Sequence, residues 1–153
     1  MSGSFALSTI VPAEPAQVFD LSLDPSIHVQ SMLRYGEELV AGPSDRLLRL
    51  DDVVTWRARH YGVPFTMTSR IVVCEPPAYF VDEQVSGPFE SFRHEHRFDP
   101  VSQGTLMTDV VTLRAPLGPL GRIAERAFLL RRLQMLIELR NTHLVAVAHA
   151  LPS

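Results

Sequence analysis

The sequence predicts an α+β fold in which a curved antiparallel sheet of about seven strands wraps around one long C-terminal helix. From about residue 48 to residue 113, short runs rich in β-branched and aromatic residues are separated by turn residues. After Gly121 the chain has no glycine or proline up to His149, and good helix formers dominate. One such helix can cover the apolar face of a sheet, and 153 residues suit a single domain, residues 1–153.

The N-terminal segment predicts one strand, two short helices and a second strand. Residues 4–10 are uncharged and end in β-branched residues, which is typical of a strand. Prolines then interrupt the chain, and residues 13–21 carry apolar residues with helical spacing. Asp24 followed by proline is an N-cap signal, so we expect a second helix that ends near Leu33. Residues 36–41 then form a strand.

Three further strands are expected at residues 53–60, 65–74 and 79–86. Side chains alternate between the two faces of a strand, so the first two have clear inner faces. The pattern of residues 79–86 is ambiguous, because apolar residues occur at both parities. The inner-face residues of the first two strands are Val54, Trp56, Ala58 and His60, followed by Phe65, Met67, Ser69, Ile71 and Val73.

The central feature is a predicted hairpin formed by residues 87–98 and 105–113. One face of its first strand is apolar at both ends and carries two imidazoles in the middle, which is unusual for an inner face. If Phe98 pairs with Thr105, His96 lies opposite Met107 and His94 lies opposite Asp109. A slip of one residue would turn Asp109 outward. The residues of this face are Phe92, His94, His96 and Phe98.

The last helix is expected to begin near Pro119 and to continue to about His149. Arg140 lies on its apolar stripe, where a guanidinium is costly unless it is paired or reaches solvent. We expect it to meet a ligand's acidic group, or to pair with Asp82, Glu83 or Asp109. The stripe consists of Leu129, Leu133, Leu136, Arg140, Leu144 and Val147, and Leu130, Met135 and Ile137 widen it.

Composition excludes several classes of protein. The formal charge of −3 argues against a broad nucleic-acid surface, and no apolar run approaches the roughly 18 residues of a membrane span. The first residues lack the basic region and the long apolar core of a signal peptide. Cys74, the single cysteine, can form no internal disulfide. Together these features favour a cytoplasmic protein.

Several segments resemble the SRPBCC helix-grip superfamily, which contains START lipid-transfer domains, pollen-allergen-type carriers and aromatic polyketide cyclases. The sequence is most similar to its small bacterial cyclase- or dehydrase-like members, and the resemblance extends from about Phe5 to Leu144. It implies a hydrophobic cavity between the sheet and the C-terminal helix, but no catalytic set. The matching segments are residues 53–62, Ser69-Arg70-Ile71, Pro76-Pro77 with Phe80, Gly87-Pro88-Phe89, His94-x-His96-x-Phe98, Gly104-Thr105, Thr108-Asp109 and residues 116–121.

The histidine pair allows three interpretations. An imidazole held by Asp109 could move protons in a cyclisation or a dehydration, with His94 or His96 as acid or base. The pair could equally be a buried, hydrogen-bonded structural element. A His-x-His pair could also ligate a metal if Asp109 or His28 converged on it, but no other metal-ligand spacing is present and we predict no metal.

The leading hypothesis is binding of a small hydrophobic or aromatic ligand in the cavity between sheet and helix, without a cofactor. An enzyme of the polyketide cyclase or dehydratase type is the alternative. A homodimer formed through Leu130 and Ile137 is a third hypothesis. Serine-nucleophile chemistry has no support, since no Gly-x-Ser-x-Gly elbow is present. The expected ligand-binding residues are Trp56, His60, Phe65, Met67, Phe92, His94, His96, Asp109 and Arg140.

Overall fold

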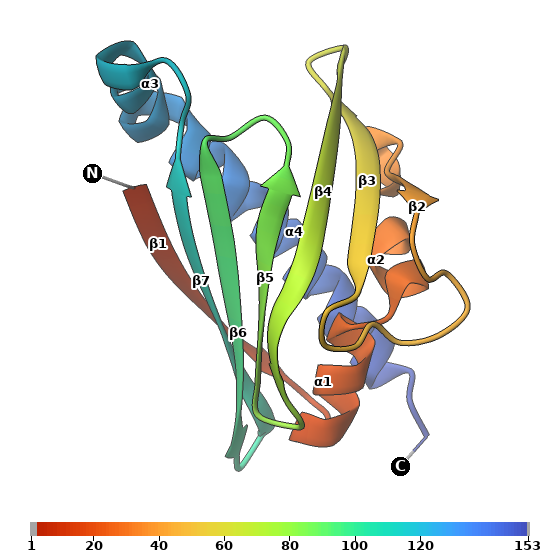
Figure 1. The fold of residues 1–153 in the computed structure, drawn as a ribbon. Helices are drawn as coiled ribbons and strands as arrows, with labels where there is room; N and C mark the ends of the chain where they lie inside the picture. The colour runs from red at the N-terminus through yellow and green to blue at the C-terminus, as the bar shows by residue number, and fades with distance from the viewer. Residues whose placement is uncertain (1–2, 153) are drawn as a thin grey trace.

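The computed structural model describes residues 3–152, apart from the side chain of Arg126. As the sequence predicts, seven strands form one antiparallel sheet, and their order is β1-β7-β6-β5-β4-β3-β2 (Figure 1). The strands are β1 (Gly3–Val11), β2 (Glu38–Ala41), β3 (Val53–His60), β4 (Val63–Glu75), β5 (Tyr79–Ser86), β6 (Ser91–Val101) and β7 (Gly104–Arg114). The helices are α1 (Pro15–Ser22), α2 (Pro25–Ser31), a 3₁₀ turn at Leu33–Tyr35, α3 (Gly118–Ala124), a π-helical turn at Glu125–Leu129 and α4 (Leu130–His149).

Local capping explains why two short helices follow β1. Glu14 and Gln17 form a reciprocal capping box at the start of α1. The Asp24 side chain accepts a hydrogen bond from the backbone N–H of Ser26 at 2.9 Å and so caps α2, as expected. With the N-termini of both helices capped, α1 buries Val18 and Phe19 in the core.

Helix α4 crosses behind the sheet (Figure 1) and packs against β1, α1 and α2. The core on either side of the imidazole pair is apolar. One cluster includes Phe98, Met107 and Leu144. The second cluster, toward the α3 end of the sheet, consists of Phe92, Val111 and Leu113. The α4 residues packed on it are Leu130, Leu133 and Ile137. No helix in residues 3–152 is both long enough and apolar enough to cross a bilayer.

The C-terminal helix is interrupted, which the sequence does not predict. The last turn of α3 leads into one π-helical turn that begins at Glu125 before α4 starts. Glu125 is buried, and its Oε2 accepts the backbone N–H of Ala115 at 3.0 Å. An uninterrupted α-helix would not direct this carboxylate toward the preceding loop. A single π-helical turn changes the direction of the side chain locally and so allows the contact.

The register of the central hairpin differs from the predicted one by two residues. Phe98 pairs with Met107 rather than with Thr105, so that His96 lies opposite Asp109 and His94 lies opposite Val111. The turn contains only two residues, because Val101 pairs with Gly104. A shift by two preserves the parity of a strand, so Asp109 still points inward.

Candidate functional site

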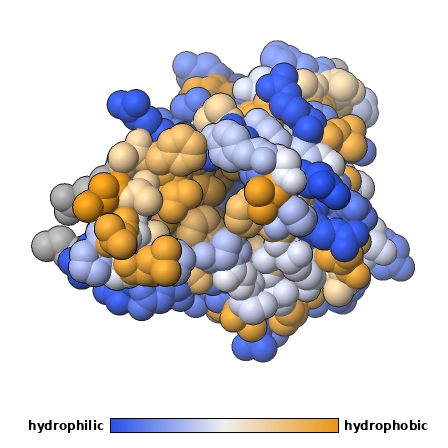
Figure 2. Space-filling model, turned by 90° about the horizontal axis from the view of Figure 1, so that it is seen from above, coloured by the Kyte–Doolittle hydropathy of each residue, from blue (hydrophilic) through white to orange (hydrophobic). Residues whose placement is uncertain are grey.

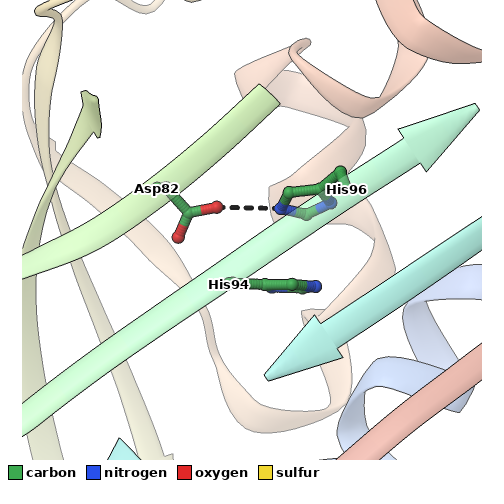
Figure 3. Close-up of side chains that lie close together, drawn as sticks. All are labelled: Asp82, His94 and His96. Atoms are coloured by element: carbon green, nitrogen blue, oxygen red, sulfur yellow. Dashed lines mark hydrogen bonds and ion pairs between the residues drawn. The ribbon is translucent and has the colours of Figure 1, made fainter. Parts of the chain in front are cut away.

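A buried polar cluster lies on the inner face of the sheet, beneath α4. Strand β5 supplies Asp82, β6 supplies His94 and His96, β7 supplies Asp109, and α4 supplies Arg140. Figure 3 shows the two imidazoles side by side on β6, with Asp82 reaching His96 from the neighbouring strand. Phe80 and Asp82 face inward, which resolves the ambiguous parity of β5.

Asp109 is the centre of this cluster and is fully buried. Its Oδ1 lies 2.7 Å from Nη2 of Arg140 and 2.7 Å from Nε2 of His94. Its Oδ2 accepts a hydrogen bond from Nδ2 of Asn141 at 2.7 Å, and Asn141 also donates to the Thr9 hydroxyl. The expected pairing of Arg140 with Asp109 is thus confirmed. A buried charge pair is tolerated when its remaining donors and acceptors are satisfied, and these contacts satisfy them.

The hydrogen bonds define the tautomers of both imidazoles. Nε2 of His94 faces Asp109, and Nε2 of His96 faces Asp82 at 2.8 Å, so in the neutral rings both Nε2 atoms carry the proton. Nδ1 of His96 lies 3.4 Å from Nη1 of Arg140. Nδ1 of His94 has no hydrogen-bond partner among the described residues, and His94 as a whole is 5% exposed. It is therefore an acceptor available to a bound molecule.

The two rings are also held by stacking. Their centroids are 3.8 Å apart, and Phe80 stacks on the far face of His96 at 4.0 Å. Phe92 meets His94 edge-on at 6.4 Å. The rings have little freedom to swing, so the free acceptor of His94 is pre-positioned.

Burial determines the charge states. Desolvation, reinforced by neighbouring His96, lowers the pKa of His94 to about 4 despite its hydrogen bond to Asp109. Burial alone would raise the pKa of Asp109, but the charge of Arg140 and the hydrogen bond from His94 hold it well below its ordinary value. The pKa of Asp82 is likewise lowered by its hydrogen bond to His96, against the effect of burial. The cluster thus contains two carboxylates, those of Asp82 and Asp109, and a single guanidinium, that of Arg140.

A metal would have to compete with this network. Ligand atoms of Asp82, His94 and His96 lie within 4.8 Å of one another. The expected third ligands were instead Asp109 or His28, and His28 is bound to Glu37. The imidazoles stack with an interplanar angle of 27° rather than converging on one point, and both Nε2 atoms already donate to carboxylates. The geometry is that of a hydrogen-bonded pair, and we assign no metal to it.

Of the predicted apolar lining, Phe92 contacts His94, and Met67 packs on the second core cluster with Phe92. Trp56 and Met67 are neighbours on paired strands, and Trp56 also stacks on His28 at 4.2 Å. Phe65 and His60 lie further toward the β3–β4 turn. At this end of the molecule, Figure 2 shows a hollow lined by apolar groups. We call the opening between α3 and the β3–β4 turn the mouth. Exposed apolar residues of these segments are Tyr61, Val63, Phe65, Leu117, Leu120, Ile123 and Phe128.

Two other hollows lie away from the imidazoles. One, of about 410 Å³, runs between β1 and α4 and is bordered by Thr9 and Asn141, the outer members of the polar cluster. The other, of about 480 Å³, lies beside α1 and residues 47–50. Neither is lined by His94 or His96.

Three contributors to the site were not predicted as site residues. Asn141 and Thr9 complete the cluster, and the Thr9 position follows from the alternation of β1, whose inner residues include Leu7 and Val11. Asp82 was expected only as a partner of Arg140, whereas it binds His96. A helix pattern offers little to signal Asn141, because its role depends on where β7 places Asp109.

A sequence-family comparison identifies the chain's relatives. The model of the family described as polyketide cyclase/dehydrase and lipid transport matches residues 2–149. A search of curated proteins gave no match.

Solved structures share the fold at low identity. Protein TTHA0849 from Thermus thermophilus has a TM-score of 0.73 at 15% identity, with 95% of this chain and 99% of that chain covered. Ginseng major latex-like protein 151 from Panax ginseng has a TM-score of 0.72 at 14% identity, with 99% of both chains covered. SA2116 from Staphylococcus aureus, a protein of unknown function, has a TM-score of 0.74 at 10% identity, covering 99% and 98%. These matches confirm the helix-grip fold.

Proposed function

Because the chain belongs to the polyketide cyclase/dehydrase and lipid-transport family of the SRPBCC superfamily, we propose that it binds a small hydrophobic or aromatic molecule between the sheet and α4. The supporting observation is the position of the His94 Nδ1 acceptor. It is unpaired among the described residues, while every other polar atom named above in this buried cluster has a partner. Pockets for small ligands typically combine an apolar lining with a few fixed polar groups, and this site has both.

The charge of the cluster restricts the ligand group that can lie there. Two carboxylates against one guanidinium disfavour an anion next to the imidazoles. A hydroxyl or N–H group, which can donate to Nδ1 of His94, fits this position. The proposed ligand therefore has an apolar body and a neutral donor at its inner end.

Ligand binding is tested by blocking the hollow from the helix side. Leu133 packs on the second core cluster but is only partly buried, so a tryptophan there would project into the hollow. We expect Leu133→Trp to weaken binding of 1-dodecanol and 2-naphthalenemethanol at least tenfold in isothermal titration calorimetry. Met135→Trp, on the same helix but 40% exposed, is the matched control and should bind as the parent protein does. Equal affinity in all three proteins would refute the site.

Native mass spectrometry adds the identity of the ligand. Protein purified from its own host should retain a small molecule that Leu133→Trp loses and Met135→Trp keeps. Retention of the same molecule by both variants would place it outside the hollow.

An acid–base enzyme is the second candidate, supported by the hydrogen bond between His94 and Asp109. The pKa of about 4 weighs against it, since a general base is most effective when its pKa lies near the working pH. At pH 7 His94 is neutral but a weak base. An enzyme would lose turnover and keep ligand affinity in His94→Ala and His96→Ala. A carrier would lose affinity and have no turnover to lose.

A further inference from the structure

The mouth contains a guanidinium without an acidic partner. Arg132, in the first turn of α4, lies 5.0 Å from the ring centroid of Tyr35 and 4.8 Å from that of Tyr61. Its Nη2 makes only a long contact of 3.5 Å to Nδ1 of His60. Its Nε is buried and has no hydrogen-bond partner among residues 3–152. The described part of the chain also offers Arg132 no carboxylate within ion-pair distance.

The acids that could neutralise this group are engaged elsewhere. Glu37 is the nearby carboxylate that acts on His60, and it is bound to His28 at 2.9 Å. His60 is itself kept neutral, because burial and the charge of Arg132 lower its pKa. Arg132 therefore supplies an uncompensated positive charge at the rim of an apolar hollow.

Arg132 also bridges the elements that surround the mouth. Tyr35 comes from the 3₁₀ turn, and His60 and Tyr61 come from the end of β3 and the following turn. Tyr61 also lies 5.8 Å from Phe128, which precedes α4. The guanidinium is thus held in an aromatic frame, while most of its donors stay unused. Cation–π contacts fix the position of the guanidinium through its faces, and its in-plane N–H groups remain able to donate hydrogen bonds.

From this arrangement we infer that Arg132 recognises a carboxylate on the ligand, and that the ligand is an amphipathic monocarboxylate with its acid group at the mouth. This inference rests on the proposed binding function and extends it to a ligand class and an orientation. A single guanidinium fork matches one planar carboxylate, whereas a dianionic phosphate would call for more than one cation. The cluster around Asp109 contains two carboxylates and one guanidinium and disfavours an acid group, so the carboxylate remains at the mouth and the opposite end of the ligand, which carries the neutral donor, points inward.

The test compares matched neutral and anionic ligands in matched variants. Dodecanoate and 1-dodecanol differ at the head group, as do 2-naphthoate and 2-naphthalenemethanol. In calorimetric titrations at pH 7.5 below the micellar range, Arg132→Gln should weaken binding of the acids about tenfold or more, the magnitude of a charge-assisted hydrogen bond. Its affinity for the alcohols should stay unchanged. Arg131→Gln, at the exposed neighbouring position, should change neither.

The outcomes separate the two proposals. If the parent protein binds the alcohols but Arg132→Gln affects acids and alcohols equally or not at all, the carboxylate assignment is wrong and the binding function stands. If the parent protein binds neither class, the binding function itself is overturned, and the assignment with it. Should Arg132→Gln not fold, nuclear Overhauser effects in the parent protein decide. The methylene next to the carboxylate should contact ring protons of Tyr35 or Tyr61, and contacts at Trp56 instead would overturn the orientation.

Discussion

Nη2 of Arg140 lies 2.7 Å from Oδ1 of Asp109, so that α4 is joined to the inner face of β7 by a buried ion pair. Arg140 is 8% exposed and Asp109 is 0% exposed, so solvent can compensate little for the loss of either partner. The neighbouring helix residue, Asn141, binds the other carboxylate oxygen. One carboxylate thus holds two consecutive side chains of the helix.

Removal of this guanidinium should be costly. Arg140→Met leaves Asp109 as a buried, uncompensated charge, and we expect a loss of about 3–5 kcal/mol in the free energy of unfolding. Urea denaturation followed by circular dichroism measures it. Arg131→Met is the control, because a substitution at this exposed position should cost less than about 0.5 kcal/mol. Similar midpoints for the two variants would contradict the structural role of the pair.

The stability of the protein should depend on pH through His94. Its pKa is about 4 when folded and near its ordinary value of 6.5 when unfolded. Between these values the unfolded chain binds a proton that the native chain does not, so stability falls as pH decreases from about 6.5 to about 4. The full contribution, on the order of 3 kcal/mol, is present above this window. Urea midpoints measured from pH 4 to pH 8 report it.

One substitution tests whether His94, rather than another histidine, causes this pH dependence of stability. His94→Gln should flatten most of this pH dependence, whereas His28→Gln, at a more exposed imidazole, should leave the slope between pH 4 and 6.5 in place. A parent-like slope in His94→Gln would assign the titration to another group.

Glu125 fixes the start of the connection between β7 and α3, where Ala115 is buried. Glu125→Ala leaves the Ala115 N–H without its acceptor and should destabilise the protein by about 1–3 kcal/mol. Glu125→Gln keeps an acceptor oxygen at the same reach and should cost less. The comparison uses the same denaturation assay, and equal losses would show that the charge of Glu125, rather than its hydrogen bond, matters.

Ile137 packs within the chain, and this bears on the homodimer hypothesis. It contacts the second core cluster, as does Leu130, so these two residues of the additional apolar face are covered by the sheet, whereas Met135 is exposed. We expect Ile137→Asp to lower the free energy of unfolding by about 1–3 kcal/mol without changing the mass in light scattering. Met135→Asp, at a position 40% exposed, should be nearly neutral. A dimer that Ile137→Asp dissociates would restore the third hypothesis.

Much of the architecture follows from local patterns, because alternation and helix spacing are written in single segments. The inner faces of β3 and β6 lie where alternation places them, as does that of β4 up to Ile71. A β-bulge between Ile71 and Val73 then reverses the parity, so that Cys74 rather than the predicted Val73 shares the inner face with Phe80. The register of the hairpin does not follow, since alternation specifies only the parity of the pairing. A two-residue turn at Ser102–Gln103 selects the observed register from those of equal parity.

Alternation along the strands also made part of the site predictable. His94, His96 and Asp109 share a face that alternation reveals, and Arg140 stands out as a charge on an apolar stripe. Asp82 does not stand out, because Phe80 and Val81 are both buried and β5 has no clear inner face. Arg132 is one arginine among several until the fold brings Tyr35 and Tyr61 to it.

The most direct measurement is the ¹⁵N spectrum of the imidazole of His94, recorded with and without 1-dodecanol or 2-naphthalenemethanol. The ligand-free protein should show the neutral tautomer protonated at Nε2, and a bound hydroxyl should shift the Nδ1 resonance as a hydrogen bond forms. A saturating alcohol that leaves both His94 nitrogens unchanged would contradict binding in the hollow between the sheet and α4.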